Sequence, residues 1–145
     1  FVMPPSYTPI IAMAIFMPFI SNNKTLQLFL PVSILFMTDL LLGFYGFTML
    51  FVYGSMILIG LLARTINDGS LGSLFKSSVT SVILWHLIVN FGVYVNGLGT
   101  KSLAQTYALA IPFDFRLLLS TLVFSLIFYL GLELSKRANN VKASD

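Results

Sequence analysis

Long runs of apolar residues, separated by short polar stretches, are the feature that most limits the folds open to this chain. Of its 145 residues, 57% are hydrophobic and 9% are charged, whereas a soluble domain carries about 25% charged residues. A chain of this length cannot bury so much apolar surface in a soluble core. No run alternates strictly between apolar and polar residues, so the sequence predicts an all-α integral membrane protein.

Five apolar segments are predicted to be transmembrane helices, and together they form one membrane domain, residues 1–134. The segments are 9–20, 26–42, 47–63, 77–96 and 117–134. The first is about 18 Å long as a helix, too short to cross a 30 Å hydrocarbon core unaided. We expect it to be either a half-helix or a crossing lengthened by its flanks. The run 103–112 is expected to be a short interfacial or re-entrant segment, and 135–145 a polar, frayed cytoplasmic tail.

Local signals mark several helix ends and connections. Thr8 followed by Pro9 is typical of a helix start, with a hydroxyl N-cap and a proline at the first helical position. Pro31 predicts a bend inside the second segment. The sequence GFYG at 43–46 predicts a tight connection, and the polar sequence RTINDGSLGSLFK at 64–76 predicts a loop.

The distribution of basic residues predicts the orientation in the membrane. If all five segments cross, six basic residues fall on one side (Lys24, Arg64, Lys76, Lys136, Arg137 and Lys142) and two on the other (Lys101 and Arg116). The side richer in lysine and arginine is expected to be cytoplasmic. The C-terminus is then cytoplasmic and Phe1 lies outside, which requires either a further crossing upstream or a cleaved signal. Of these we expect the further helix, and six helices in all.

Polar residues from separate segments are predicted to meet in the outer half of the membrane. A carboxylate such as Asp39 is costly in an apolar helix unless it has a partner or lies at an edge. His86, Asn90 and Tyr94 are spaced four apart and share one helix face, and the helix start at Thr8 offers free N–H groups to an anionic group. Apolar walls with a few placed polar groups are typical of a ligand pocket. The candidate ligand-binding residues are therefore Thr8, Asp39, Asn90, Tyr94 and His86.

Structural interpretations of the same residues stay open. Asp39 also suits a helix-end acid that reaches water, or a structural partner for another element. Asn90 and His86 also suit hydrogen bonding between helices, which contributes about 0.6 kcal/mol per bond on average in membranes. Asp114 and Arg116 are expected to mark the boundary with water.

The residue types present exclude several functions. There are no cysteines, so disulfides, thiol catalysis and thiolate metal sites are ruled out. With a single histidine, a metal site would depend on oxygen ligands. No nucleophile–base set, paired carboxylates on one helix, phosphate loop or HExxH motif is found, so we predict neither an enzyme nor a bound cofactor or metal. The net charge of +3 reflects loop asymmetry rather than nucleic-acid binding.

Four motifs resemble a family of small bacterial membrane proteins of unassigned function, described only as candidate transport proteins. They are SYTPIIAMAIF (6–16), LPVSILFMTDLLLGF (30–44), LIVNFGVYV (87–95) and TYALAIPF (106–113). The match covers roughly residues 6–116 and departs from the family pattern at Ser6-Tyr7 and at His86. The positions that match the family motifs are Thr8, Pro9, Asp39, Gly43, Asn90 and Gly92.

The resemblance implies a function as well as a fold. The hydropathy of the family is similar to that of the S components of energy-coupling-factor transporters, which have six helices, an outward-facing pocket and a docking surface on the first helix. It implies a substrate-binding membrane subunit in a bacterial inner membrane, embedded in lipid and energised by a partner subunit. The alternative is a non-transporting accessory subunit of a larger membrane complex.

Overall fold

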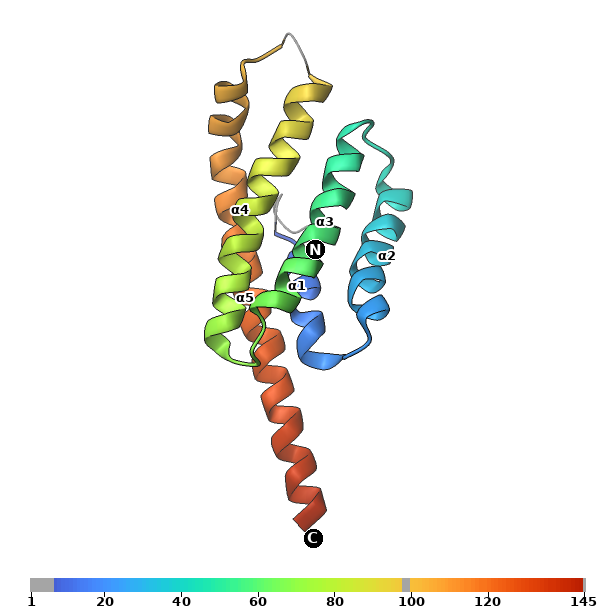
Figure 1. Cartoon of the computed structure of the whole chain (residues 1–145), viewed down its shortest axis with the longest axis vertical. Coiled ribbons are helices and arrows are strands. Elements are labelled where there is room, and N and C mark those ends of the chain that lie inside the picture. The colour runs from blue at the N-terminus through green and yellow to red at the C-terminus, as the bar shows by residue number, and fades with distance from the viewer. Residues whose placement is uncertain (1–6, 98–99, 145) are drawn as a thin grey trace.

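The computed structural model describes residues 7–97 and 100–144, and within them the chain forms five helices and no strand. Successive helices run antiparallel and form one bundle (Figure 1). The helices are α1 (Ile10–Ile20), α2 (Lys24–Leu42), α3 (Thr48–Ile66), α4 (Leu71–Asn96) and α5 (Leu103–Ser144). In the same part of the chain, four helices, α2 to α5, are long and apolar enough to cross a membrane. This is consistent with the predicted multi-pass membrane protein.

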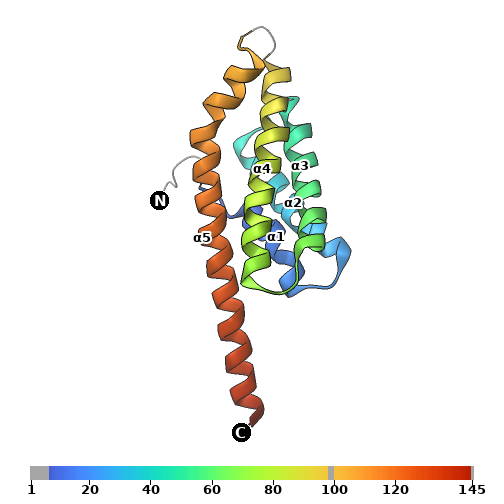
Figure 2. The ribbon, with the colours of Figure 1, turned by 60° about the vertical axis from the view of Figure 1, so that its left-hand side comes forward.

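The predicted division of 103–134 into a short interfacial segment and a separate last helix is wrong. Helix α5 runs without interruption from Leu103 and contains Pro112. Proline removes one backbone hydrogen bond and bends a helix, but a helix in apolar surroundings keeps its remaining bonds because no water competes for them. Figure 2 shows the result, a long helix that is bent in its orange, N-terminal part.

The predicted fraying of residues 135–145 is also wrong for the described residues, because α5 continues to Ser144. Extending an existing helix avoids the cost of nucleating a new one. Lys136 donates to Glu133 at 3.1 Å across one turn, which adds a small stabilisation. The C-terminal part of α5 projects beyond the ends of the other helices (Figure 1).

Helix α4 begins six residues earlier than the predicted residue 77, so the predicted polar loop is mostly helical. Ser70 is the N-cap, and its hydroxyl oxygen accepts from the Ser73 N–H at 3.1 Å. This cap satisfies a backbone donor that would otherwise be free. Between α2 and α3, Gly43 and Gly46 have φ of 98° and 77°, a conformation that favours glycine, and the predicted tight connection is confirmed.

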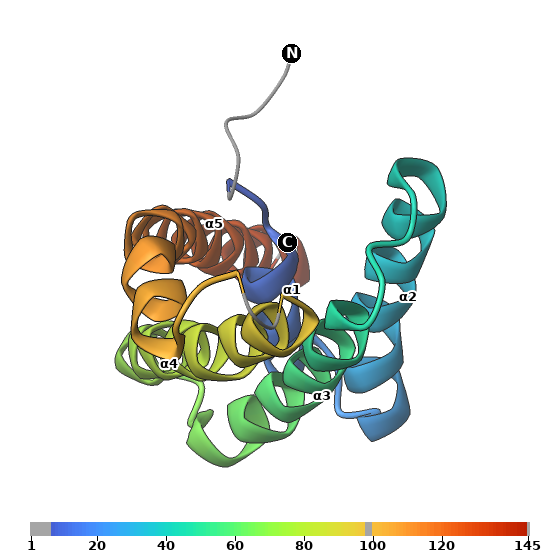
Figure 3. The ribbon, with the colours of Figure 1, turned by 90° about the horizontal axis from the view of Figure 1, so that it is seen from above.

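Helix α1 is the centre of the bundle. Ile11 and Ile15 are fully buried, and Figure 3 shows α1 enclosed by the other helices. The helix is apolar all round, as a buried helix must be. It starts near mid-height, where the Thr8 carbonyl accepts from the Ser120 hydroxyl of α5 at 3.1 Å. The described residues that flank α1 do not lengthen it as a helix. It begins at Ile10, and the Thr8 hydroxyl accepts from the Ile10 N–H at 3.3 Å.

Helix α2 lies at the edge of the bundle, on the far side of α3 from α5 (Figure 3). It buries few side chains, which are Gln27, Pro31 and Asp39. At its lower end the Gln27 side chain donates to the Ser21 carbonyl and accepts from Arg64, both at 2.6 Å. Arg64 also donates to the Lys24 carbonyl. Lys24 and Arg64 therefore lie at the same end of the bundle, as the predicted orientation requires.

Candidate functional site

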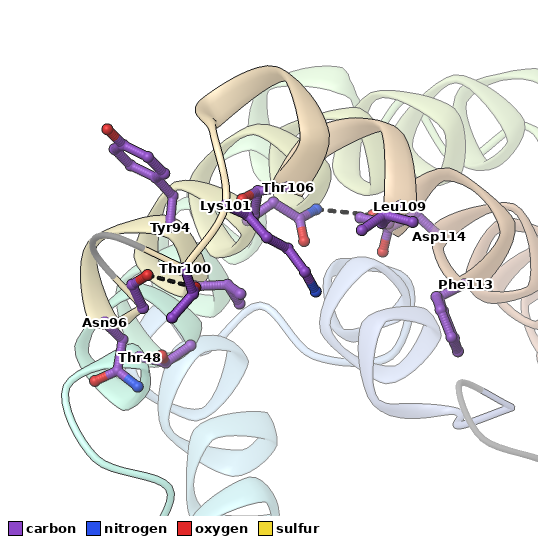
Figure 4. Close-up of a pocket in the computed structure, with 13 residues that line it drawn as sticks. Thr48, Tyr94, Asn96, Thr100, Lys101, Thr106, Leu109, Phe113 and Asp114 are labelled. Atoms are coloured by element: carbon purple, nitrogen blue, oxygen red, sulfur yellow. Dashed lines mark hydrogen bonds between the residues drawn. The ribbon is translucent and has the colours of Figure 1, made fainter.

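A cleft of about 430 Å³ opens at one end of the bundle, between the start of α3 and the hairpin of α4 and α5. Figure 4 shows its lining. The described residues around it are Thr48, Asn90, Val93, Tyr94, Asn96, Gly97, Thr100, Lys101, Thr106, Leu109, Ala110, Phe113 and Asp114. The walls combine apolar side chains with several polar ones, and the volume falls within the range of small-molecule sites.

Three hydrogen-bonded side chains, which we call the polar floor, lie at the deep end of the cleft: His86, Asn90 and Asp114. The Nδ1 atom of His86 lies 2.6 Å from Oδ2 of Asp114. The Asn90 amide donates to the same oxygen at 2.9 Å and to the His86 carbonyl at 2.8 Å. The side chains of His86 and Asp114 are 24% and 14% exposed. Each partner offsets the desolvation cost of the carboxylate.

The polar floor follows from the register of the α4–α5 hairpin. His86 lies ten residues before the end of α4 at Asn96, and Asp114 lies eleven residues after the start of α5 at Leu103. In an antiparallel hairpin, residues equally far from the connection face each other. A second bond joins the same two helices, because the Tyr107 hydroxyl of α5 donates to the Leu87 carbonyl of α4 at 2.6 Å.

Sequence reasoning missed Asp114 as the partner of His86 and Asn90. It treated 103–112 as a separate element, which removed the hairpin that sets the register, and it placed Asp114 at the water boundary. The signal was present in the near-equal spacing of His86 and Asp114 from the polar sequence that joins the two helices. A continuous helix from Leu103 would have revealed it.

The mouth of the cleft carries a positive charge. Among the described lining residues Lys101 is the one base and Asp114 the one acid. In Figure 4 the Lys101 side chain extends from the α4–α5 connection toward the middle of the cleft, whereas the Tyr94 ring points away from it. The hydroxyl of Thr100, the residue before Lys101, donates to the Gly97 carbonyl at 2.6 Å.

Asp39 belongs to a second cluster outside the cleft, which we call the α2 latch: Asp39, Tyr45 and Tyr53. The Asp39 side chain accepts from the Tyr53 hydroxyl at 2.7 Å and from the Tyr45 hydroxyl at 3.3 Å, and the residue is only 5% exposed. Burial, and then the negative charge of Asp39, raise the pKa of Tyr45 to about 12. Tyr45 therefore stays protonated and remains a donor at neutral pH.

The α2 latch and the polar floor lie at the same height on opposite sides of α3. Phe51 packs directly on Gly92, where an added Cβ atom would come within 2.6 Å of the ring. Tyr53 is two residues beyond Phe51, and Asn90 is two residues before Gly92, so the antiparallel pair places them level. No hydrogen bond in the described part of the chain joins the latch to the floor.

The five predicted ligand-binding residues are thus divided among three places. Asn90 and Tyr94 line the cleft, and His86 lies beneath it as part of the polar floor. Asp39 is in the α2 latch. Thr8 is level with Ser120, six residues or about 9 Å along α5 beyond Asp114, so it lies deeper in the bundle than the floor.

The chemistry open to the cleft is binding and proton exchange. Within residues 7–97 and 100–144, no group of three or more His, Cys, Asp or Glu side chains gathers around a point that could hold a metal ion. The carboxylate of Asp114 can accept a hydrogen bond or pair with a cation, and His86 at 2.6 Å can share a proton with it.

The fold and the cleft together define a helical protein with membrane-spanning potential and one polar-floored site at the end of its bundle. The chain belongs to the family described as "Family of unknown function (DUF6580)", which matches residues 1–143. This agrees with the predicted membership of a family of unassigned function. Neither a curated protein nor a solved structure matches the chain.

Proposed function

We propose that this protein is the substrate-binding membrane component of a transporter for a small molecule, with the cleft as its binding site. The observation that carries the proposal is the polar floor: a partly buried carboxylate, held by His86 and Asn90, at the deep end of a cleft that combines apolar and polar walls. Such an arrangement excludes much of the water around a ligand while one placed charge fixes its orientation. The proposal includes no catalytic step.

The position of charges along α5 supports a cleft at the membrane surface. Residues 117–132 carry no charge, and they span about 24 Å as a helix, close to the thickness of a hydrocarbon core. Asp114 lies just beyond one end of this stretch, and the cleft opens further out. Most basic residues belong to the opposite end, which favours an outward-facing cleft and a cytoplasmic C-terminus in a bacterial inner membrane.

The proposal assigns the energy for transport to a partner. The chain offers no nucleotide-binding loop, so transport would be driven by an ATP-hydrolysing module or would run down a gradient. The resemblance to S components, which rests on hydropathy and on the likeness of an outward-facing pocket, favours the first of these. Fold-level analogy is weak support for function, so the proposal depends on the cleft.

A thermal-shift screen of the purified protein in detergent, against vitamins and common metabolites, tests this proposal. We expect at least one compound to raise the midpoint of thermal unfolding through binding to the folded state. The variant Asn90→Ala removes one donor of the polar floor and should weaken that binding. Asn139→Ala, on the exposed projection of α5, is the matched control and should bind like the wild type.

Two results would argue against a binding site in the cleft. One is a complete screen in which no compound stabilises the protein. The other is a stabilising compound whose affinity is the same in Asn90→Ala and Asn139→Ala, because that compound would bind elsewhere.

A second function, as an accessory subunit of a larger membrane complex, is favoured by the projection of α5. Two large apolar side chains near or on this projection, Leu134 and Val141, are 65% and 62% exposed. A short helical segment without neighbours is marginal in water. Packing against another subunit would stabilise the projecting part of α5. Gentle detergent extraction distinguishes the two functions. Recovery in one stoichiometric assembly with redox subunits would favour the accessory role, whereas recovery alone would oppose it.

A further inference from the structure

The cleft carries one charge of each sign, at its two ends. Asp114 is at the deep end and is mostly buried, whereas Lys101 is exposed at the mouth. Leu109 and Phe113 contribute apolar surface to the same cleft, next to polar residues such as Thr106. A cleft with an acid at one end and a base at the other suits a ligand that carries a charge at each end.

The hydrogen bonds of the polar floor leave one oxygen of Asp114 for a ligand. His86 and Asn90 both contact Oδ2, and no bond from the described residues reaches Oδ1. Oδ1 of Asp114 is therefore left as an acceptor for a group of the ligand. An ammonium group is the ligand group that matches such a carboxylate, since it donates charge-assisted hydrogen bonds.

Lys101 is placed to hold an anion. Its side chain extends toward the middle of the cleft (Figure 4), and among the described residues it takes part in no ion pair. A lysine ammonium group is a compact charge on a flexible stem, so it can adjust to the carboxylate of ligands of different lengths. The Thr100 hydroxyl beside it donates to a backbone carbonyl and does not compensate the charge.

We propose that the cleft binds a dipolar small molecule, an amino acid whose amine pairs with Asp114 and whose carboxylate pairs with Lys101. This inference rests on the proposed function, because it names the class of substrate for the same cleft. It goes further in requiring both charges on one molecule. A singly charged compound would leave one end of the cleft uncompensated, and a neutral compound would leave both.

The test uses the full chain in detergent and a series of ω-amino acids from glycine to 6-aminohexanoate. Each is compared with the alkylamine and the alkanoate of the same length, by thermal shift and by calorimetric titration. We expect at least one ω-amino acid to bind about tenfold more tightly than either singly charged analogue, as the loss of one charged hydrogen bond predicts. Asp114→Asn should remove the preference for the amine.

A second variant, with a reversed charge at the mouth of the cleft, keeps the test valid if Asp114→Asn fails to fold. Lys101 is exposed, so Lys101→Glu leaves the bundle intact, and it should change the preference from an ω-amino acid to the α,ω-diamine of the same length. Lys76→Glu, an exposed lysine near the opposite end of the bundle, is the matched control and should keep the wild-type preference.

The outcomes separate this inference from the proposed function. If a neutral or singly charged metabolite binds the cleft and no dipolar compound does, the dipolar substrate is wrong while the binding function stands. An unchanged preference in Lys101→Glu also overturns it. If no compound of any class stabilises the protein, the proposed function fails and the substrate class fails with it.

Discussion

The bundle places two aspartates at the same height on either side of α3, and they are used differently. Asp114 lies on α5, which packs along α4, and it faces a cleft with histidine and asparagine as partners. Asp39 lies on α2, which packs loosely at the edge, and it is closed off by two tyrosine hydroxyls. Identical side chains at one depth thus serve an open site and a sealed contact.

The difference shows what decides the role of an acid in a membrane protein. Asp39 buries almost all of its surface on a helix that otherwise exposes apolar residues to the surroundings, so its bonds hold α2 to α3. Asp114 keeps an unused oxygen next to an open volume. Depth alone does not distinguish them, whereas the donors around each carboxylate do.

The largest expected effect comes from the close contact between Phe51 of α3 and Gly92 of α4. This contact sets the relative height of the α2 latch and the polar floor. Gly92→Ala places a Cβ atom 2.7 Å from the Phe51 Cβ atom, which cannot rotate away, so we expect a loss of about 3 kcal/mol in the free energy of unfolding. Gly54→Ala is the matched control, because nothing lies within 4 Å of the added atom. Chemical unfolding in detergent compares them. Equal stability of the two variants would show that α3 and α4 do not pack as described.

Removing the latch should be the next largest change. Asp39→Ala leaves the partly buried Tyr53 hydroxyl without its acceptor at 2.7 Å, at a cost on the order of 2 kcal/mol. Ligand affinity of the cleft should stay the same, since no described hydrogen bond connects Asp39 with the polar floor. A fall in ligand affinity together with the fall in stability would mean that the two aspartates belong to one site. The separate roles assigned to Asp39 and Asp114 would then be wrong.

The two latch tyrosines should differ from each other. Tyr53→Phe removes the shorter hydrogen bond, 2.7 Å, and should cost about 1 kcal/mol of unfolding free energy. Tyr45→Phe removes the 3.3 Å bond of a residue that is 40% exposed and should cost less. Thermal unfolding of the two variants side by side measures the difference, and the reverse order would show that Tyr45 is the main donor to Asp39.

The smallest expected effect concerns a third aspartate, Asp68, in the exposed connection before α4. Donation from the Ser70 hydroxyl and backbone N–H lowers the pKa of Asp68 below its ordinary 3.8. Because the folded pKa is the lower one, the stabilisation is present above about pH 4 and is lost as the pH falls through the folded pKa. Unfolding midpoints between pH 5 and pH 2 should therefore fall slightly less for Asp68→Asn than for the wild type. Parallel curves would contradict the assignment.

Much of the architecture could be predicted, because it depends on local patterns. Apolar runs bounded by polar residues define α2 and α3 closely, and the two glycines between them require a tight turn. The run 9–20 was predicted to be too short to cross unaided, and α1 is indeed a short helix, Ile10–Ile20. The end of α4 could be read from sequence, but its start at Leu71 depends on a serine cap inside a stretch that looks like a loop.

The site was harder to predict, because it depends on register between helices. Asn90 and Tyr94 were placed correctly near one end of the bundle by their spacing along α4. Asp114 was missed because the short run 103–112 was predicted to be a separate interfacial or re-entrant segment, whereas α5 is continuous from Leu103. Asp39 and Thr8 were grouped with Asn90 by depth alone, whereas the actual neighbours of Asp39 are set by which helix lies beside α2. Sequence spacing fixes faces of helices but not which faces meet.

The central place of α1 has a consequence for how the protein is made. The contact between Thr8 and Ser120 joins residues 112 positions apart, so α1 leaves the ribosome long before its partner on α5 exists. Until α5 has been synthesised, the short helix α1 lies in the membrane or at its surface without its final neighbours. Completion of the bundle is therefore a late event, and a chain cut short before α5 would expose α1 to lipid, to chaperones and to proteolysis.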